Sequence, residues 1–503
     1  MGWNYPETHD EYRRSKQVLL NDPTLLKTQA YIDGKWCNAD NQATYAVNDP
    51  ANGEKLADVA KCGSAETRRA IEAADKAMPA WRAKTAKERG FILRNWFNLM
   101  LENKDDIATI MTMECGKPLT ESHGEVMYAA SFIEWFAEEA KRAYGDTIPT
   151  HNPTQRLVTI KQGIGVTAGI NPWNFPAAMI TRKAAPALAA GCPQVVKPAE
   201  ATPLTALALA ELADRAGIPA GVLSIVTGDR DDAAAIGGEL TSNPIVRKVS
   251  FTGSTPVGKL LMSQASASVK KVSLELGGNA PFIVFDDADI DAAIPGVIAS
   301  KFRNAGQTCV CANRILVQES VYEEFSLKLA KAVSEFKVGH GTEAGVTLGP
   351  VINDIAISKI DRLVSSAKAA GATPMVGGNP HALGNGFYEP TVLTGVDLDM
   401  DIANNEIFGP VAALYKFKTE EDAIRIANDT PFGLASYFYS RDIGRVWRVS
   451  EGLEYGMVGA NTGIISAETV PFGGIKESGI GREGGHQGLN EYMEDKYICM
   501  GDI

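Results

Sequence analysis

The residue best suited to covalent chemistry in this sequence is Cys309. It follows the short segment Gly306-Gln307-Thr308, and a thiol becomes a nucleophile once it loses its proton. We expect this segment to lead into a helix whose N-terminus lowers the pKa of the thiol. The alternative is an inert buried thiol, the usual state of a single cysteine. A cysteine–histidine protease is not indicated, because none of the six histidines has a recognisable catalytic setting.

Two further side chains could assist a nucleophile. Asn174 lies in the segment NPWNFP (171–176), directly after an apolar strand expected at 164–170. Its amide could donate a hydrogen bond to an oxyanion. Glu275 lies in ELGG at the end of another expected strand, where the glycines let a ligand approach and the carboxylate could act as a base. Each could also belong to a purely structural turn.

Two other turns could hold a nucleotide. Lys197 and Glu200 in KPAE follow a short strand and suit ribose hydroxyls, although a solvated charge pair is the alternative. Gly253 and Ser254 in FTGS join a strand to a helix whose free N–H groups could receive a pyrophosphate. FTGS is not the GxGxxG fingerprint, so it is weak evidence alone.

The elements that must position these residues alternate between strand and helix. A helix opens at Thr202-Pro203, with the threonine as N-cap and the proline at the first position, and it ends at Gly217. Short connections between strands and helices predict right-handed crossovers and a parallel, doubly wound sheet. Strands are expected at 194–197, 222–226, 246–251, 271–275, 281–285 and 491–500. Helices are expected from residue 64 and at 91–103, 126–144 (ended by Gly145), 202–216, 231–240 and 254–265. The first 30 residues are expected to form a loosely attached arm or a short helix.

Composition excludes several classes of protein. The chain has 503 residues, 45% hydrophobic and 22% charged, which is typical of a globular protein. Its net charge of −12 argues against a nucleic-acid or anionic-membrane partner. No uninterrupted apolar run is long enough to span a membrane, and no secretion signal begins the sequence. Seven unpatterned cysteines indicate a reducing compartment, which we expect to be the cytoplasm, and no metal site.

Taken together and in order, seven motifs resemble the aldehyde dehydrogenase superfamily. They are PWNFP, KPAE, FTGS, ELGG, GQTC, EIFGP and PFGG, and they extend the resemblance over residues 30–500. Within that superfamily the chain is most similar to the succinate-semialdehyde dehydrogenase family, in phrases such as SKFRNAGQTCVCANR and PFGGIKESGIGREG.

The resemblance implies a mechanism. Cys309 would attack the aldehyde carbon, while Asn174 and the Cys309 backbone N–H hold the oxyanion. Hydride transfer to a nicotinamide would leave a thioester, hydrolysed by a water that Glu275 activates. The substrate would be succinate semialdehyde, with its carboxylate held by Arg182, Arg303 and Ser478. Salt bridges to acidic residues are the alternative for both arginines.

The resemblance also implies the cofactor site. Lys197 and Glu200 would hold the adenosine ribose, and Glu406 the nicotinamide ribose. Because a carboxylate at Glu200 would repel a 2′-phosphate, we expect NAD over NADP, with NADP use possible. The full cofactor set is Ile170, Pro172, Trp173, Asn174, Lys197, Ala199, Glu200, Gly228, Phe251, Gly253, Ser254, Val257, Leu276, Glu406 and Phe408.

The implied architecture has three parts. A doubly wound, Rossmann-type NAD(P)-binding domain would span 1–149 and 163–279, and an α/β catalytic domain 280–470. A small β oligomerisation element and active-site loop would comprise 150–162 and 471–503, giving a homodimer or homotetramer. Some relatives with the same CVC segment form a reversible disulfide, so Cys311 could switch Cys309, although packing is the alternative. The implied pathway is 4-aminobutyrate degradation.

Two other interpretations remain open. The substrate could be glutarate semialdehyde, one carbon longer, or a broader range of aliphatic aldehydes, because one methylene changes binding by only about 1–3 kcal/mol. The chain could instead be a catalytically silent binding protein on the same scaffold, since fold alone does not establish function. The joint presence of Cys309, Glu275 and Asn174 argues against the silent protein.

Overall fold

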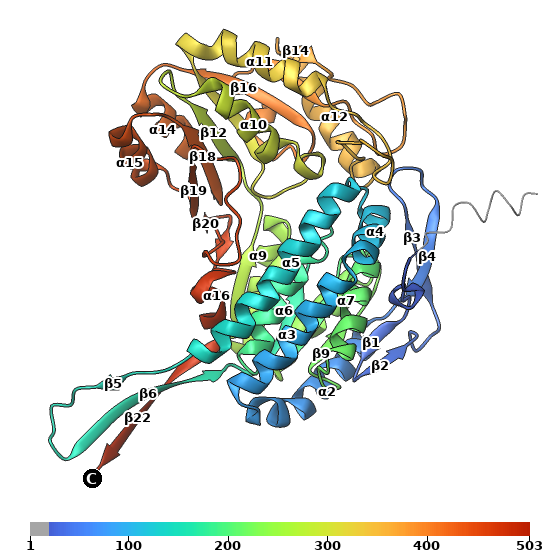
Figure 1. The fold of residues 1–503 in the computed structure, drawn as a ribbon, viewed down its shortest axis with the longest axis vertical. Helices are drawn as coiled ribbons and strands as arrows, with labels where there is room; N and C mark the ends of the chain where they lie inside the picture. The colour runs from blue at the N-terminus through green and yellow to red at the C-terminus, as the bar shows by residue number, and fades with distance from the viewer. Residues whose placement is uncertain (1–19, 503) are drawn as a thin grey trace, which may run out of the picture.

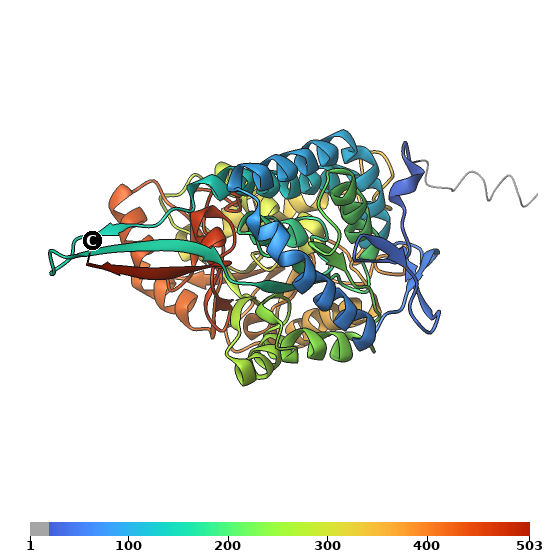
Figure 2. The ribbon, with the colours of Figure 1, turned by 90° about the horizontal axis from the view of Figure 1, so that it is seen from below.

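The computed structural model describes residues 20–502, which form two large β-sheets covered by helices and a projecting three-stranded arm (Figures 1 and 2). The predicted N-terminal arm lies mostly outside the described residues. Its described end forms a single 3-10 turn, η1 (Pro23–Leu25), and leads into the first strand.

The first sheet has eight strands and is doubly wound. Its order is β2 (Lys35–Cys37), β1 (Ala30–Ile32), β9 (Leu223–Ile225), β8 (Gln194–Lys197), β7 (Val166–Ile170), β10 (Val246–Thr252), β11 (Lys271–Glu275) and β21 (Gly479–Ile480). The chain moves outward from β7 through β8 to β9 and then returns to β10 on the other side of β7, all in parallel. The direction of winding therefore reverses between β7 and β10, and such a reversal opens a crevice at the carboxyl ends of the strands.

Helices cover both faces of this sheet. One face carries α2 (Ser64–Ala83), α8 (Ala233–Ser242) and α9 (Thr255–Ala265). The other carries α3 (Ala86–Glu102), α4 (Lys104–Cys115), α5 (Leu119–Glu139), α6 (Ala178–Ala189) and α7 (Pro203–Arg215), with α16 (Gly485–Asn490) beside α6.

The second sheet has seven strands, all from residues 280–460. Its order is β14 (Thr373–Val376), β15 (Thr391–Thr394), β16 (Val411–Phe417), β13 (Ala312–Gln318), β12 (Ala280–Val284), β18 (Ala435–Tyr439) and β19 (Met457–Ala460), parallel except for β14 at one edge. Its helices are α10 (Ile290–Lys301) and α11 (Tyr322–Ser334) on one side, and α12 (Asp354–Ala369), α13 (Asp401–Asn404), α14 (Glu420–Asn428) and α15 (Ile443–Gly452) on the other.

The arm is a three-stranded antiparallel sheet. It pairs β22 (Met493–Gly501) with β6 (Gln155–Gly163) along their whole length, and β6 with β5 (Thr147–Ile148). It extends away from the body, and the C-terminus lies at its tip (Figure 1). Two further ribbons pair β3 (Thr44–Asn48) with β4 (Lys55–Ala60) and β17 (Phe432–Gly433) with β20 (Ile475–Lys476). The remaining 3-10 turns are η2 (Ala140–Arg142), η3 (Ser266–Ser268), η4 (Arg303–Gly306) and η5 (Glu319–Val321).

The predicted strands and crossover helices of the first sheet are confirmed to within two residues, but three details of the helices are wrong. The helix expected at 91–103 begins five residues earlier, as α3. The helix expected at 126–144 starts seven residues earlier as α5 and ends before Gly145, whose backbone passes so close to Thr159 that a Cβ would lie 1.9 Å from its carbonyl oxygen. Thr202 does not cap α7 with its side chain. The Glu114 carboxylate of α4 does so instead, accepting from the N–H groups of Leu204 and Thr205 at 2.8 Å.

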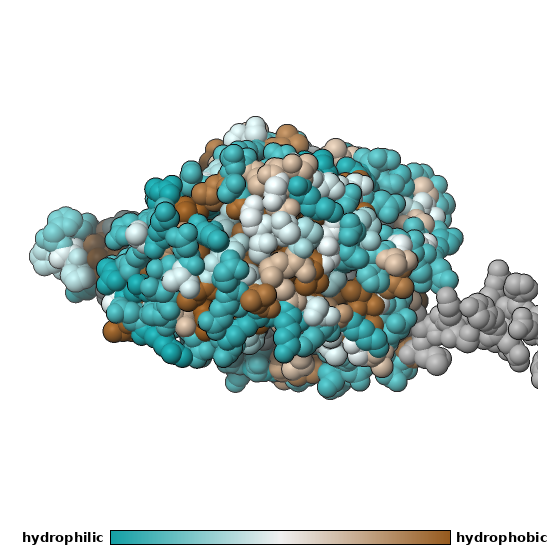
Figure 3. Space-filling view, turned by 90° about the horizontal axis from the view of Figure 1, so that it is seen from above, coloured by the Kyte–Doolittle hydropathy of each residue, from teal (hydrophilic) through white to brown (hydrophobic). Residues whose placement is uncertain are grey.

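On the face shown in Figure 3, hydrophilic residues predominate and apolar residues lie among them. None of the helices between residues 20 and 502 combines the length and apolarity needed to cross a bilayer.

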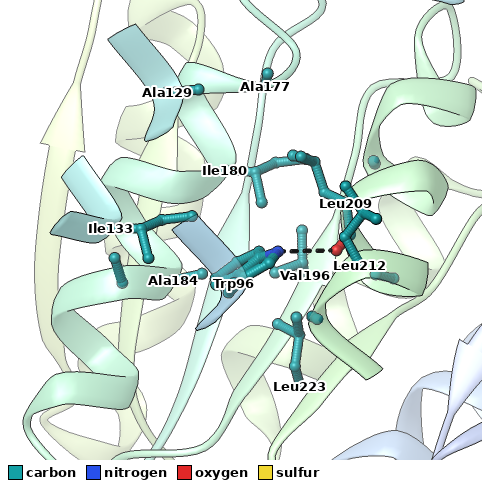
Figure 4. Packing of buried hydrophobic residues seen from close by; sticks show 14 of the residues in the cluster. Trp96, Ala129, Ile133, Ala177, Ile180, Ala184, Val196, Leu209, Leu212 and Leu223 are labelled. Atoms are coloured by element: carbon teal, nitrogen blue, oxygen red, sulfur yellow. Dashed lines mark hydrogen bonds between the residues drawn. The ribbon is translucent and has the colours of Figure 1, made fainter. Parts of the chain in front are cut away.

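The main core lies between α3, α5, α6 and α7 and the first sheet, with Trp96 at its centre (Figure 4).

Trp96 should be a major contributor to stability. Its ring is fully buried and its Nε1 donates to the Leu209 carbonyl at 3.1 Å. We expect Trp96→Ala to lower the free energy of unfolding by about 3–5 kcal/mol, because the cavity left behind cannot collapse fully. The control is Trp447→Ala on α15, where a side chain 65% exposed should cost about 0.5 kcal/mol or less. Urea unfolding at fixed protein concentration measures both, and equal losses would contradict the prediction.

Candidate active site

A cavity of about 550 Å³ lies where the carboxyl ends of β7, β10 and β11 face the segments around residues 303–310, 352–359 and 406–408. It collects residues from both large sheets. The predicted residues that line it are Pro172, Trp173, Asn174, Arg182, Gly253, Ser254, Glu275, Leu276, Arg303, Cys309, Glu406 and Phe408.

Cys309 lies in a turn directly before β13, and no helix follows it, so the predicted helix N-terminus is wrong. Burial raises the pKa of the thiol to about 12, while the positive charges of Arg182 and Arg303 act in the opposite direction. Activation therefore depends on charged groups that face the sulfur across the cavity rather than on a helix dipole.

The loop before Cys309 is held in an unusual backbone conformation. Asn304 and Ala305 have φ angles of 52° and 53°, in the left-handed region that costs energy for residues other than glycine. The half-buried Glu121 carboxylate accepts from the Asn304 N–H at 2.7 Å, and the Gln307 side chain accepts from the Ile352 N–H at 2.9 Å. These bonds fix the loop and so place the sulfur.

Asn174 is fixed by three hydrogen bonds. Its backbone carbonyl accepts from Lys117 Nζ at 2.7 Å and from Asn304 Nδ2 at 2.9 Å, and its own Nδ2 donates to the Gln307 carbonyl at 2.9 Å. Because an amide nitrogen carries two hydrogens, one donor remains. The free N–H can receive an oxyanion formed at a carbonyl attacked by Cys309.

Glu275 ends β11 and is 3% exposed, with both carboxylate oxygens unpaired in the described structure. Burial raises its pKa well above the ordinary value, and the charge of Glu483 adds to the effect, while Arg182 and Lys183 oppose it. A carboxyl group with a raised pKa can exchange a proton with a water molecule at neutral pH.

Arg182 and Arg303 lie at one end of the cavity and differ in their pairing. Arg182 forms a buried ion pair with Glu483, Nε to Oε2 at 2.6 Å, and its guanidinium lies 4.0 Å over the Phe472 ring. Its NH2 group has no acceptor. Arg303 lies 5.4 Å from the Phe175 ring, and its buried Nε also has no acceptor. The predicted salt-bridge alternative thus holds for Nε of Arg182, while the NH2 group of Arg182 and Nε of Arg303 have no acceptor.

Ser478 does not reach this end of the cavity, which corrects the prediction. It is fully buried, donates to the Gly277 carbonyl at 2.7 Å and accepts from the Gly433 N–H at 3.0 Å, so it holds backbone segments together. The serine that lines the cavity near the arginines is Ser466. No motif marked Ser466, because it lies in an irregular segment before the PFGG loop and only the fold brings it to the arginines.

Glu406 and Phe408 lie opposite the cysteine loop. Glu406 accepts from the Gly278 N–H at 3.2 Å, and burial raises its pKa to about 7. The Phe408 ring packs edge-on against Trp173 with centroids 5.7 Å apart. Arg230 and Lys359 also line the cavity and were not predicted, since single basic residues on a loop and a helix carry no sequence signal.

The turn after β10 fits a pyrophosphate. Ser254 is the N-cap of α9 but makes no side-chain bond to the helix, so the N-terminal N–H groups of this 11-residue helix lack a side-chain acceptor. Ile170 pairs in register with both Lys197 and Phe251, which places these three predicted residues along one edge of the sheet. The donors at this edge therefore suit a dinucleotide.

Seven predicted cofactor residues lie outside the cavity lining. Lys197 is buried, donates to the Pro198 carbonyl at 3.1 Å and lies 4.0 Å from Glu200 Oε2. Burial lowers the pKa of Lys197, while the charges of Glu200, Asp232 and Asp229 oppose this. The others are Ile170, Ala199, Gly228, Phe251 and Val257. Gly228 packs against Ile236, whose Cδ1 would lie 2.6 Å from an added Cβ, so its contact is with the protein.

Cys311 is buried and its thiol donates to the Lys301 carbonyl at 3.1 Å, away from the cavity lining. Burial raises its pKa. The observed contact favours packing over the predicted switch. Within residues 20–502, no three His, Cys, Asp or Glu side chains are grouped as ligands for a metal ion.

Comparison with known proteins gives one consistent answer. The model of the aldehyde dehydrogenase family matches residues 36–498. The chain is 61% identical to a glutarate-semialdehyde dehydrogenase of Pseudomonas aeruginosa over 97% of this chain and 100% of that protein. It is also 61% identical to the succinate-semialdehyde dehydrogenase [NADP(+)] GabD of Escherichia coli, over 96% and 100%. A crystal structure of succinate-semialdehyde dehydrogenase from Burkholderia pseudomallei has a TM-score of 0.95 at 63% identity, covering 96% and 99%. Fold and comparison agree, and the chain belongs to the aldehyde dehydrogenase family.

Proposed function

We propose that this protein oxidises succinate semialdehyde to succinate with NAD(P) as the hydride acceptor. The observation that carries the proposal is a pair of guanidinium groups in the same cavity as Cys309, those of Arg182 and Arg303, each with a buried nitrogen that has no acceptor. Buried donors without acceptors are costly, and a carboxylate supplies acceptors to both forks. An aldehyde that carries a carboxylate satisfies the arginines and the nucleophile together.

The reaction follows from the side chains in the cavity. The Cys309 thiolate attacks the aldehyde carbon, and the free N–H of Asn174 Nδ2 and the Cys309 backbone N–H stabilise the oxyanion. NAD(P) bound in this cavity would supply the acceptor for the hydride that leaves the resulting thiohemiacetal as it becomes a thioester. The Glu275 carboxylate then takes a proton from a water molecule that attacks the Cys309 thioester, which releases the acid and restores the thiol.

Glu275→Gln should separate the two halves of this reaction. Because the amide cannot accept the proton of water, we expect one equivalent of NAD(P)H per site in a burst, followed by turnover reduced about 10²–10⁴-fold. Mass spectrometry of the acid-quenched enzyme should find an acyl group on the peptide that contains Cys309. The control, Cys309→Ser, should give neither burst nor acyl group. A burst without acylation would contradict the mechanism.

Arg303→Ala should weaken recognition of the carboxylate. We expect the KM for succinate semialdehyde to rise at least about ten-fold, the loss of a charge-assisted hydrogen bond, with a much smaller change for butanal, which has the same chain length. Arg303 is the cleaner variant, because Arg182→Ala also leaves Glu483 with one cation fewer in the buried cluster. Equal losses with both aldehydes would argue against a carboxylate site.

Glutarate semialdehyde is the second candidate substrate. A relative at 61% identity carries that name, and another, at 59%, is named 3-sulfolactaldehyde dehydrogenase. Since one methylene changes binding by only about 1–3 kcal/mol, overlapping use is expected. Comparing kcat/KM across semialdehydes of three to six carbons ranks the candidates.

NAD is the preferred cofactor in this proposal, with NADP use possible. Glu200, Asp229 and Asp232 carry acidic side chains whose charges act on Lys197, the predicted ribose ligand. A 2′-phosphate placed there would meet several like charges, whereas a 2′-hydroxyl can donate to a carboxylate. The E. coli relative is named for NADP(+). The proposed preference for NAD therefore rests on the acidic residues near Lys197 in this chain, not on that relative.

Glu200→Ser should shift the preference toward NADP. We expect kcat/KM with NADP to rise about ten-fold and the value with NAD to fall, because the substitution removes one negative charge and one ribose acceptor. Asp231→Asn, an acidic neighbour whose charge is not among those acting on Lys197, is the control and should change the ratio little. A wild-type ratio that favours NADP several-fold would overturn the proposed preference.

The proposed domains follow the two large sheets, with cofactor binding by 1–149 and 163–279 and catalysis by 280–470. The arm formed by β5, β6 and β22 is the proposed contact between subunits of a homodimer or homotetramer. It projects with exposed apolar side chains, Ile160, Tyr497 and Met500.

Seven free cysteines support a reducing compartment such as the cytoplasm. Degradation of 4-aminobutyrate is the proposed pathway.

A further inference from the structure

Tyr128 on α5 reaches the arginine end of the cavity, together with Ser466, Arg182 and Arg303. Its ring packs edge-on against Phe132, one helical turn further along, with centroids 4.9 Å apart. Phe132 in turn lies 5.3 Å from the guanidinium of Arg182. Because α5 packs against α6, which carries Arg182, the phenol and the guanidinium are held by two adjoining helices.

The hydroxyl of Tyr128 is buried, and although Ser466 lies close enough to act on it, no hydrogen bond of good geometry reaches it from the described residues. A buried tyrosine hydroxyl usually finds a partner, since leaving it unpaired costs about 1–3 kcal/mol. Burial raises the pKa of Tyr128, while the two arginines and Ser466 oppose this, so the phenol keeps its proton at neutral pH. It is therefore available as a donor.

The donors at this end of the cavity match one carboxylate in number. An ionised carboxylate has about four lone-pair sites. The unpaired NH2 of Arg182, the unpaired Nε of Arg303 and the hydroxyls of Tyr128 and Ser466 supply four donors. A phenylalanine at position 128 would pack on Phe132 equally well, so packing alone does not account for the hydroxyl.

We propose that Tyr128 is a substrate-binding residue whose hydroxyl donates a hydrogen bond to the carboxylate of the semialdehyde. This inference rests on the proposed function, because it names a further ligand of the same carboxylate. The bond is charge-assisted and short, and it selects aldehydes that present an anion at this depth of the cavity. Tyr128 takes no part in the chemistry at Cys309.

The test compares Tyr128→Phe with the wild-type enzyme on succinate semialdehyde and on butanal. We expect the KM for the semialdehyde to rise about ten-fold, with kcat unchanged and both constants for butanal unchanged. The inhibition constant of butyrate, which carries the carboxylate without the aldehyde, should rise by the same factor. The control is Tyr415→Phe, which removes another buried, unpaired hydroxyl from the core of the second sheet and should leave all values unchanged.

Each other outcome overturns the inference. An unchanged KM for the semialdehyde would mean that the hydroxyl does not reach the carboxylate. Equal rises for semialdehyde and butanal would assign Tyr128 a packing role. Failure of the proposed function has a different signature, because the wild-type enzyme itself would then show no preference for succinate semialdehyde over butanal.

Discussion

The active site depends on one buried carboxylate, that of Glu483. It lies between Lys183 and Arg182, two successive residues of α6, and Lys183 also donates to Thr252 at the end of β10. The carboxylate arrives on the C-terminal segment just before α16, so the cluster ties three distant parts of the chain together. Removing one member of a buried ion cluster leaves the others uncompensated, at a cost of about 3–5 kcal/mol. The segment that passes beneath the cavity is thus fixed by charge.

This arrangement also sets the proton affinity of Glu275. The charge of Glu483 raises the pKa of Glu275, and the same Glu483 partly neutralises the two cations that would lower it. Lys183 and Arg182 therefore pair mainly with Glu483. As a result, Glu275 is the carboxyl group that binds a proton more readily. Two carboxylates in one buried region thus take different roles, one structural and charged, the other able to exchange a proton.

Local patterns predicted the parts of the fold that local rules govern. Strands with apolar runs and helices bounded by Pro203 and Gly217 were placed well, because periodicity and backbone preferences act over a few residues. The wrong details involve distant partners. Glu114 caps α7 from another helix, and Ser466 rather than Ser478 reaches the arginines. No pattern within a short window contains such contacts, so sequence reasoning alone could not find them.

The positive charges of Arg182 and Arg303 act both on the Cys309 thiol and on the carboxylate of the substrate. In the free cavity they lower the pKa of the Cys309 thiol against the effect of burial. A substrate carboxylate bound between them neutralises part of that field, so it makes thiolate formation less favourable at the moment when the thiolate is needed. An uncharged aldehyde leaves the field intact. A more reactive sulfur therefore cannot explain a preference for a semialdehyde over an uncharged aldehyde. The preference must come from the binding of the carboxylate, which also positions the aldehyde carbon. For this reason neutral donors, a serine and a tyrosine hydroxyl, are well suited to the remaining lone pairs of the carboxylate. They donate hydrogen bonds to it without adding a further charge to the cavity.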